Sequence, residues 1–133
     1  MVDGAELMKK LQVKAGARLL LVNVPQPFSA ALVADTDVLS VAPGEAFDGA
    51  LVFCEAPADV EAAVPSIIPA LPADGLLWFA YRKGAAAKKS GLSRDVGWSS
   101  LLALGFETVR SIAFDEEWTG LRFRQSSAVN ARR

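Results

Sequence analysis

The 133-residue chain contains no histidine and only one cysteine, Cys54. Without histidine it cannot form a Ser-His-Asp or Cys-His nucleophile, and it lacks the side chain that most often binds metals. A single cysteine forms neither an intrachain disulfide nor a cysteine-ligated zinc site, so we expect no metal and a reducing compartment. Because Cys54 follows an apolar run, a packed and unreactive thiol is favoured over a nucleophile.

Long hydrophobic runs and a secretory leader are also lacking. The longest uncharged stretch, residues 19–34, is interrupted by prolines and polar residues. It therefore falls short of the roughly 18 apolar residues that a membrane-spanning helix needs. The first residues carry the carboxylates of Asp3 and Glu6 where a signal peptide would carry basic side chains. We therefore predict a cytoplasmic protein with no membrane contact.

Positive charge is missing from almost half of the chain. Residues 19–81 hold eight carboxylates and no lysine or arginine, whereas residues 82–133 hold ten basic and five acidic side chains. This division predicts two electrically different surfaces, of which the basic one attracts anions. An ordinary solvated surface explains the same pattern. So does self-association, in which the acidic half of one copy meets the basic half of another.

Hydrophobic patterning predicts strands that alternate with helices. The expected strands are residues 17–23, residues 38–41, residues 48–54 and a run ending at Tyr81, followed by a hairpin of residues 107–114 and 119–124. The expected helices are residues 3–11, 28–34, 58–71 and 93–104. Ser93 is expected to cap the last helix and Gly105 to end it.

Such alternation implies right-handed crossovers and a mostly parallel sheet, to which the hairpin adds an antiparallel edge. We therefore predict an α/β fold, a single Rossmann-like three-layer domain over residues 1–124, with a mostly parallel sheet of about six strands and a C-terminal antiparallel hairpin. Trp78 and Phe79 should lie in the core on opposite faces of this sheet. Residues 125–133 are expected to form a flexible basic tail.

Reactive side chains follow the predicted strands at their carboxyl ends, the edge where open α/β sheets bind ligands. The loop after Tyr81 carries five cations between Arg82 and Arg94 with no carboxylate among them. It leads into a predicted helix N-terminus, which suits a phosphate or a carboxylate, although a mobile solvated loop is equally compatible. We predict a ligand site formed by Asn23, Glu55, Tyr81, Lys83, Gly84, Lys88, Lys89, Arg94, Asp95 and Trp118.

The acidic turn of residues 115–118 is expected to return to the same edge. Its carboxylates and Trp118 could then face the basic loop. The alternative is a hairpin whose Trp118 packs on the sheet and whose carboxylates pair with Arg94 or Arg122. Arg94 and Asp95 likewise suit a simple pairing and capping role at the start of their helix.

Nucleotide and cofactor signatures are broken in this chain. The first strand runs into NVPQPF, without the glycine-rich turn that lets a backbone approach a dinucleotide, and the second ends in Val41-Ala42-Pro43 without a carboxylate for a ribose. The Lys89-Ser90 pair imitates the end of a phosphate loop, but Lys83 and Lys88 stand where its glycines belong. We therefore expect no cofactor.

Two resemblances support the predicted fold. The turn at residues 72–75 leading into LLWFAY resembles the second half of class I S-adenosylmethionine-dependent methyltransferases, in which a KPGG-type turn precedes the equivalent strand. YRKG at 81–84, LSRD at 92–95, Trp98 and FDEEWTGLRFR at 114–124 resemble an uncharacterised bacterial family described only as a domain of unknown function.

That second resemblance spans the chain from Lys14 onward. The family has proline where Arg82 stands and a longer polar segment where residues 85–87 stand. It implies a methyltransferase-like fold and lends no activity. The positions that fit are Tyr81, Lys83, Gly84, Arg94, Asp95, Trp118, Leu121 and Arg122.

Three functions are compatible with these features. The first is a degenerate methyltransferase-like domain that binds a small anionic ligand at the carboxyl edge of the sheet. The second is an enzyme acting on an anionic substrate with Glu55 or Asp95 and Lys83, and the third is a homo-oligomeric interaction module. Nucleic acid binding is disfavoured because the basic loop has no interleaved aromatic residues. We place the small anionic ligand first.

Overall fold

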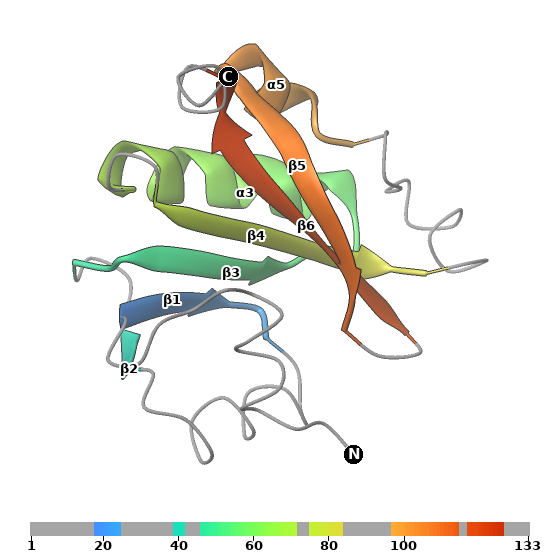
Figure 1. The fold of residues 1–133 in the computed structure, drawn as a ribbon, viewed down its shortest axis with the longest axis horizontal. Helices are drawn as coiled ribbons and strands as arrows, with labels where there is room; N and C mark the ends of the chain where they lie inside the picture. Colours follow the sequence, from blue (N-terminus) through green and yellow to red (C-terminus); the bar gives the residue numbers. More distant parts are fainter. Residues whose placement is uncertain are drawn as a thin grey trace.

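The computed structural model describes residues 18–24, 39–41, 46–71, 75–83, 97–114 and 117–126. These residues form a single six-stranded sheet in the order β2-β1-β3-β4-β6-β5 (Figure 1). The strands are β1 (Arg18–Val22), β2 (Leu39–Val41), β3 (Gly49–Phe53), β4 (Leu76–Arg82), β5 (Phe106–Ala113) and β6 (Trp118–Gln125). The helices are α3 (Pro57–Ile67), the short 3-10 helix η1 (Ile68–Ala70) and α5 (Ser99–Ala103).

The sheet changes from parallel to antiparallel pairing at β4. Strands β2, β1, β3 and β4 pair in parallel, whereas β4 pairs antiparallel with β6, and β6 with β5. The predicted α/β sheet with a C-terminal antiparallel hairpin is therefore confirmed. It was expected to be mostly parallel, and the structure shows a mixed sheet in which β2, β1, β3 and β4 pair in parallel. Because β6 runs opposite to β4, its first residue, Trp118, lies in register with Arg82 at the end of β4.

The central strands are buried on both faces because nearly all their side chains are apolar. Consecutive residues of β4 alternate between the faces, so Phe79 packs in one core cluster and Trp78 in the other, as predicted. Gly120 of β6 has a local steric reason. A Cβ at this position would overlap the Phe114 ring, which packs over the strand.

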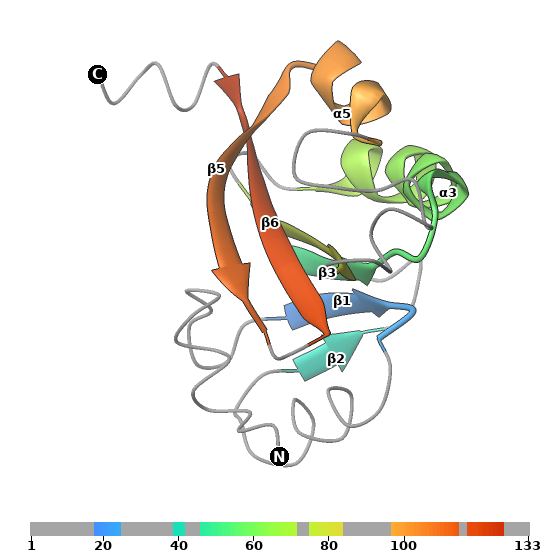
Figure 2. The same cartoon turned by 90° about the vertical axis from the view of Figure 1, so that its right-hand side faces the viewer.

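The two described α-helices, α3 and α5, cover the same face of the sheet (Figure 2). Helix α3 buries Val60, Ala63, Val64 and Ile67, a spacing that forms one helical stripe. It ends soon after Pro65 and continues as η1, so it is shorter than the predicted helix of residues 58–71, as a proline inside a helix favours. A third layer would need helices on the other face, and those predicted at residues 3–11 and 28–34 lie outside the described residues.

Helix α5 corrects the prediction of a helix from Ser93 to Leu104. Gly97 has a φ of 102° and Trp98 is not helical, so α5 begins only at Ser99 and Ser93 does not cap it. The buried Trp98 ring packs against the rings of Phe79 and Phe123, which fixes the chain before the helix starts. At the other end, Gly105 has a φ of 87° and follows the helix as predicted.

The hairpin continues slightly further than predicted at both ends of β6. Trp118 is a strand residue instead of part of the turn, and Gln125 is the last residue of β6. Ser126 then donates its backbone N–H to the Gly105 carbonyl over 2.8 Å. None of the helices in the described part of the chain is long and apolar enough to cross a membrane.

Candidate functional site

A pocket of about 370 Å³ opens where β1, β3 and β4 end and β6 begins. This edge lies on the right-hand side of Figure 1, where the arrowheads of β3 and β4 point. Strand tips far apart in the sequence therefore meet at one edge, as parallel pairing requires. The pocket is lined by Asn23, Phe53, Glu55, Asp59, Arg82 and Trp118.

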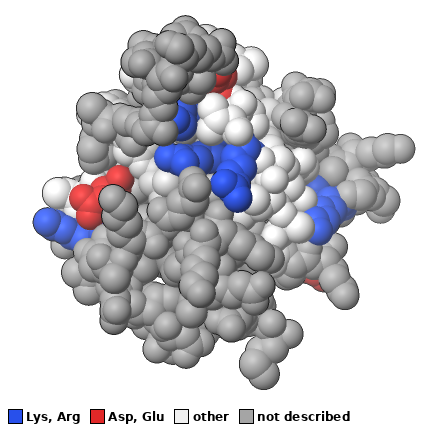
Figure 3. Space-filling model, viewed as in Figure 1, with Lys and Arg blue, Asp and Glu red and all other residues white. Residues whose placement is uncertain are grey.

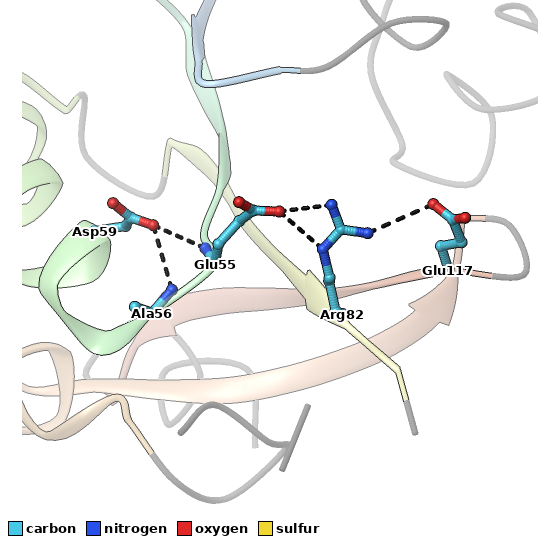
Figure 4. Close-up of polar contacts among 5 residues, drawn as sticks. All are labelled: Glu55, Ala56, Asp59, Arg82 and Glu117. Carbon is cyan, nitrogen blue, oxygen red and sulfur yellow. Dashed lines mark hydrogen bonds and ion pairs between the residues drawn. The ribbon is translucent and has the colours of Figure 1, made fainter. Parts of the chain in front are cut away.

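Arg82, the last residue of β4, holds the centre of this site. Its Nε and Nη2 donate to Oε1 of Glu55 over 2.8 and 2.6 Å, and its Nη1 lies 3.5 Å from Oε2 of Glu117. Figure 4 shows the guanidinium between these two carboxylates. Its Cζ also lies 4.4 Å from the centroid of the Trp118 ring, a cation–π contact. Glu55 and Trp118 thus hold one positive group at the pocket, and Glu117 lies further from it.

Glu55 is held in place by the start of α3. The carboxylate of Asp59 accepts the backbone N–H of Glu55 over 2.8 Å and that of Ala56 over 3.3 Å. Asp59 lies in the first turn of the helix, where such acceptors satisfy N–H groups that lack an intrahelical partner. The bend between β3 and α3 is therefore fixed, and with it the backbone from which the Glu55 side chain extends.

An aromatic wall closes the pocket on the face away from α3. The ring centroids of Phe53 and Trp118 lie 4.8 Å apart in an edge-on arrangement, and Phe114 packs 5.8 Å from Phe53. Phe53 and Trp118 are 1% and 4% exposed, so the wall is tightly packed. The polar groups of the site therefore rest on a rigid apolar base.

Asn23, the residue directly after β1, also lines the pocket. Among the described residues, Asn23 is the one non-glycine residue whose φ is positive, and its φ is 56°. Asparagine tolerates this left-handed conformation better than most residues. The turn presents an exposed amide at the pocket edge.

The structure brings three of the ten predicted site residues together in the pocket: Asn23, Glu55 and Trp118. Tyr81 lies on the helix-covered face, where its ring packs 6.0 Å from that of Trp98, and it does not line the pocket. Lys83 lies at the same edge, and its backbone N–H donates to the Glu117 carbonyl over 2.9 Å. The other five predicted residues lie outside the described part of the chain: Gly84, Lys88, Lys89, Arg94 and Asp95.

The sequence interpretation missed Phe53, Asp59 and Arg82 as parts of the site. Arg82 had a signal, because it is the first cation after the stretch of residues 19–81 without positive charge and it ends a strand. It was nevertheless grouped with the basic loop that follows. Glu117 of the acidic turn forms an ion pair with Arg82, a partner that the sequence interpretation did not include.

Cys54 is fully buried beside the site and faces the helix-covered core. Burial, and to a smaller extent the nearby Asp59 carboxylate, raises the pKa of its thiol to about 12. The thiol therefore stays protonated at neutral pH, which supports its interpretation as a packed apolar residue.

The basic half of the sequence forms a visible surface feature. Figure 3 shows lysine and arginine side chains gathered in the centre of the view, over β5 and β6. Arg110 and Arg122 lie opposite each other there, in register across the two strands. This face is separate from the pocket at the strand tips. It provides an arginine, the exposed Arg110, that can serve as a control for Arg82.

Solved structures of methyltransferases have the same fold as this chain. The N-methyltransferase NodS from Bradyrhizobium japonicum WM9 is 15% identical, with 90% of this chain and 93% of that chain covered and a TM-score of 0.55. The glycopeptide N-methyltransferase MtfA is 13% identical, with 92% and 96% covered and a TM-score of 0.58. A ribosomal protein L11 methylase from Lactobacillus delbrueckii subsp. bulgaricus is 13% identical, with 92% and 76% covered and a TM-score of 0.54.

These similarities establish a methyltransferase-like fold. The resemblance of the turn at residues 72–75 and the strand after it to class I methyltransferases implied the same fold. Identities this low define the fold alone. No family model matches the sequence, and no curated protein matches it significantly. The resemblance to an uncharacterised bacterial family therefore gains no support from a family model.

Proposed function

We propose that this methyltransferase-like domain binds a small anionic ligand at the carboxyl edge of its sheet, with Arg82 as the anchor. The observation that carries the proposal is the placement of one immobilised guanidinium at a pocket on an aromatic base. A charge that is already oriented loses little conformational freedom when it binds a ligand, which favours affinity. Lys83, which follows Arg82 directly, adds a positive charge at the same edge.

Binding is favoured over catalysis because of how Glu55 is used. Its Oε1 accepts two N–H groups of Arg82, so this carboxylate serves to hold the guanidinium in place. The second residue pair of the enzymatic alternative, Asp95 with Lys83, includes a residue outside the described part of the chain. Within the described ranges, no base lies beside a second reactive group in an arrangement that would support a specific reaction.

S-adenosylmethionine, the cofactor of the fold family, does not fit the described residues. Strand β2 ends at Val41 and is followed in the sequence by Ala42 and Pro43, so it brings no carboxylate to hold a ribose. The segment after β1 begins with Asn23, Val24 and Pro25 instead of glycine. We therefore propose a domain that works without this cofactor and assign no step to it.

Thermal denaturation with added anions tests the proposal. Acetate, citrate, phosphate and S-adenosylmethionine are added separately at matched ionic strength to the full chain. A ligand that binds the native state raises its Tm. We expect at least one simple anion to do so. We expect Arg82→Ala to weaken its binding roughly tenfold to a hundredfold, as loss of a charged hydrogen-bond donor predicts.

Two variants make this experiment specific. Arg82→Lys keeps the charge but loses the planar fork, so we expect partial binding. Arg110→Ala removes an exposed arginine on β5 away from the pocket, and its Tm should respond to anions as the wild type does. A response that survives in Arg82→Ala, or a response to S-adenosylmethionine alone, contradicts the proposal.

A further inference from the structure

We infer that the anionic group of the ligand is a carboxylate, and that it binds by displacing the Glu117 side chain from Arg82. The inference rests on the proposed function and specifies the class of ligand. It depends on the geometry around one guanidinium, in which two protein carboxylates make contacts of very different quality.

Glu55 takes one side of the guanidinium with short contacts. A guanidinium has five N–H donors in one plane, and Glu55 uses those of Nε and one of Nη2 over 2.8 and 2.6 Å. The other side is formed by Nη1 and the remaining N–H of Nη2, and Figure 4 shows Nη1 pointing toward Glu117. A planar carboxylate matches two parallel N–H groups of this kind, so this side suits a second bidentate pair.

Glu117 fills that second side poorly. Its Oε2 lies 3.5 Å from Nη1, whereas charge-assisted N–H···O pairs are typically about 2.7–2.9 Å long. The Glu117 side chain is 71% exposed, so water competes for the same contact. A ligand carboxylate that reaches both Nη1 and Nη2 would therefore replace a long contact with two shorter ones.

The displacement leaves the hairpin intact. The backbone carbonyl of Glu117 accepts the N–H of Lys83 over 2.9 Å, and the next residue, Trp118, pairs with Arg82 in the sheet. Because these contacts are made by the backbone, displacing the Glu117 side chain from Arg82 does not require the strand pairing to change. Glu117 acts as an internal carboxylate that occupies the ligand's position on Arg82 until the ligand arrives.

The charges around the pocket disfavour a divalent anion more than a monovalent one. Glu55 and Asp59 both line it, so the described lining carries two negative charges and one positive charge. A phosphate monoester or inorganic phosphate brings close to two negative charges at neutral pH and meets stronger repulsion than a carboxylate does. We therefore expect the ligand to carry a carboxylate, the same group as the Glu117 side chain that it displaces.

The experiment follows the Arg82 Nε–Hε signal by NMR in the ¹⁵N-labelled full chain. Sodium acetate and inorganic phosphate are titrated separately at matched ionic strength, and the signal is assigned by its absence in Arg82→Lys. We expect acetate to shift it saturably and at lower concentration than phosphate. Removal of the competing negative charge, in Glu117→Gln with the side chain kept and in Glu117→Ala with the side chain truncated, should tighten acetate binding about twofold to fivefold.

The control is Glu61→Gln, which removes one negative charge from the exposed face of α3 and leaves the pocket lining unchanged. It should alter acetate affinity less than either Glu117 variant. Equal effects of the Glu61 and Glu117 variants, or tighter binding of phosphate, overturn the carboxylate inference and leave the proposed function intact. Failure of both anions to shift the Arg82 signal overturns the proposed function as well.

Discussion

Trp98 and Trp118 are almost equally buried, at 2% and 4% exposure, yet they lie in different surroundings. Trp98 packs on the helix-covered face against the rings of Phe79 and Tyr81. Trp118 packs on the other face against Phe53, and the Arg82 guanidinium lies over its ring. Burial alone therefore does not separate a core tryptophan from one that supports a site. The charged group stacked on the ring does.

The two surroundings arise from strand alternation at the end of β4. Consecutive residues point to opposite faces, so Tyr81 joins the closed core and Arg82 reaches the pocket. The same alternation separates Phe53, which lines the pocket, from Cys54, which belongs to the core. Each strand tip thus contributes one residue to stability and its neighbour to the site.

The comparison predicts that stability and binding respond differently at the two tryptophans. Truncation of either to alanine should lower the free energy of unfolding by about 3–5 kcal/mol, because a large buried ring is lost. The milder Trp98→Phe and Trp118→Phe separate the roles. Only Trp118→Phe should weaken anion binding, since tryptophan is the best cation–π partner for Arg82.

Urea denaturation measures the stability of these variants, and the acetate titration measures their binding. Equal losses of affinity in Trp98→Phe and Trp118→Phe would show that both rings support the pocket alike, and the distinction drawn between them would be wrong.

Cys54 sharpens the same comparison through pH. Its thiol has a pKa of about 12 in the folded chain against 9.0 as the ordinary value, so the unfolded chain loses the proton first. The contribution to stability is therefore constant below about pH 9 and falls as the pH rises toward 12. We expect the free energy of unfolding to fall by about 1 kcal/mol between pH 8 and pH 10 through this group.

Urea denaturation at the two pH values tests this, with Cys54→Ala as the reference in which this component of the slope is absent. Alkylation gives a second measurement, because a thiol this rarely ionised should react with iodoacetamide far more slowly in the native state than in urea. Rapid native labelling at pH 8 would place Cys54 in an open site instead of the core.

Local patterns were sufficient for most of the fold. The apolar runs of β1, β3 and β4 are bounded by turn residues, and their positions follow from the sequence alone. The start of α5 was predicted wrongly. The Trp98 ring packs against Phe79 of β4 and Phe123 of β6, and this packing outweighs the local capping signal at Ser93. Tertiary contacts of this kind leave no mark in a short window of sequence.

The centre of the site depends on such contacts even more. Arg82 is 27 residues from Glu55 and 35 from Glu117, so its partners follow from which strands pair and in which register. The prediction that strand tips converge placed Asn23, Glu55 and Trp118 correctly at one edge. The pairing of Arg82 with two carboxylates required the β4–β6 register, which periodicity does not encode.

A variant of Asp59 tests how far anion binding depends on the bonds that hold the backbone of Glu55. Its expected effect is the smallest of those predicted. Asp59→Ala removes the acceptor for the N–H groups of Glu55 and Ala56, and loss of such a cap costs about 1 kcal/mol. Because Glu55 then loses its fixed position, Arg82 should be held less firmly and acetate should bind more weakly. Glu61→Gln alters an exposed residue of the same helix, two positions after Asp59. It should change stability and acetate affinity only slightly. Urea denaturation and the acetate titration of both variants measure this. Loss of stability in Asp59→Ala with unchanged acetate affinity would mean that Arg82 is oriented by Trp118 without help from Glu55.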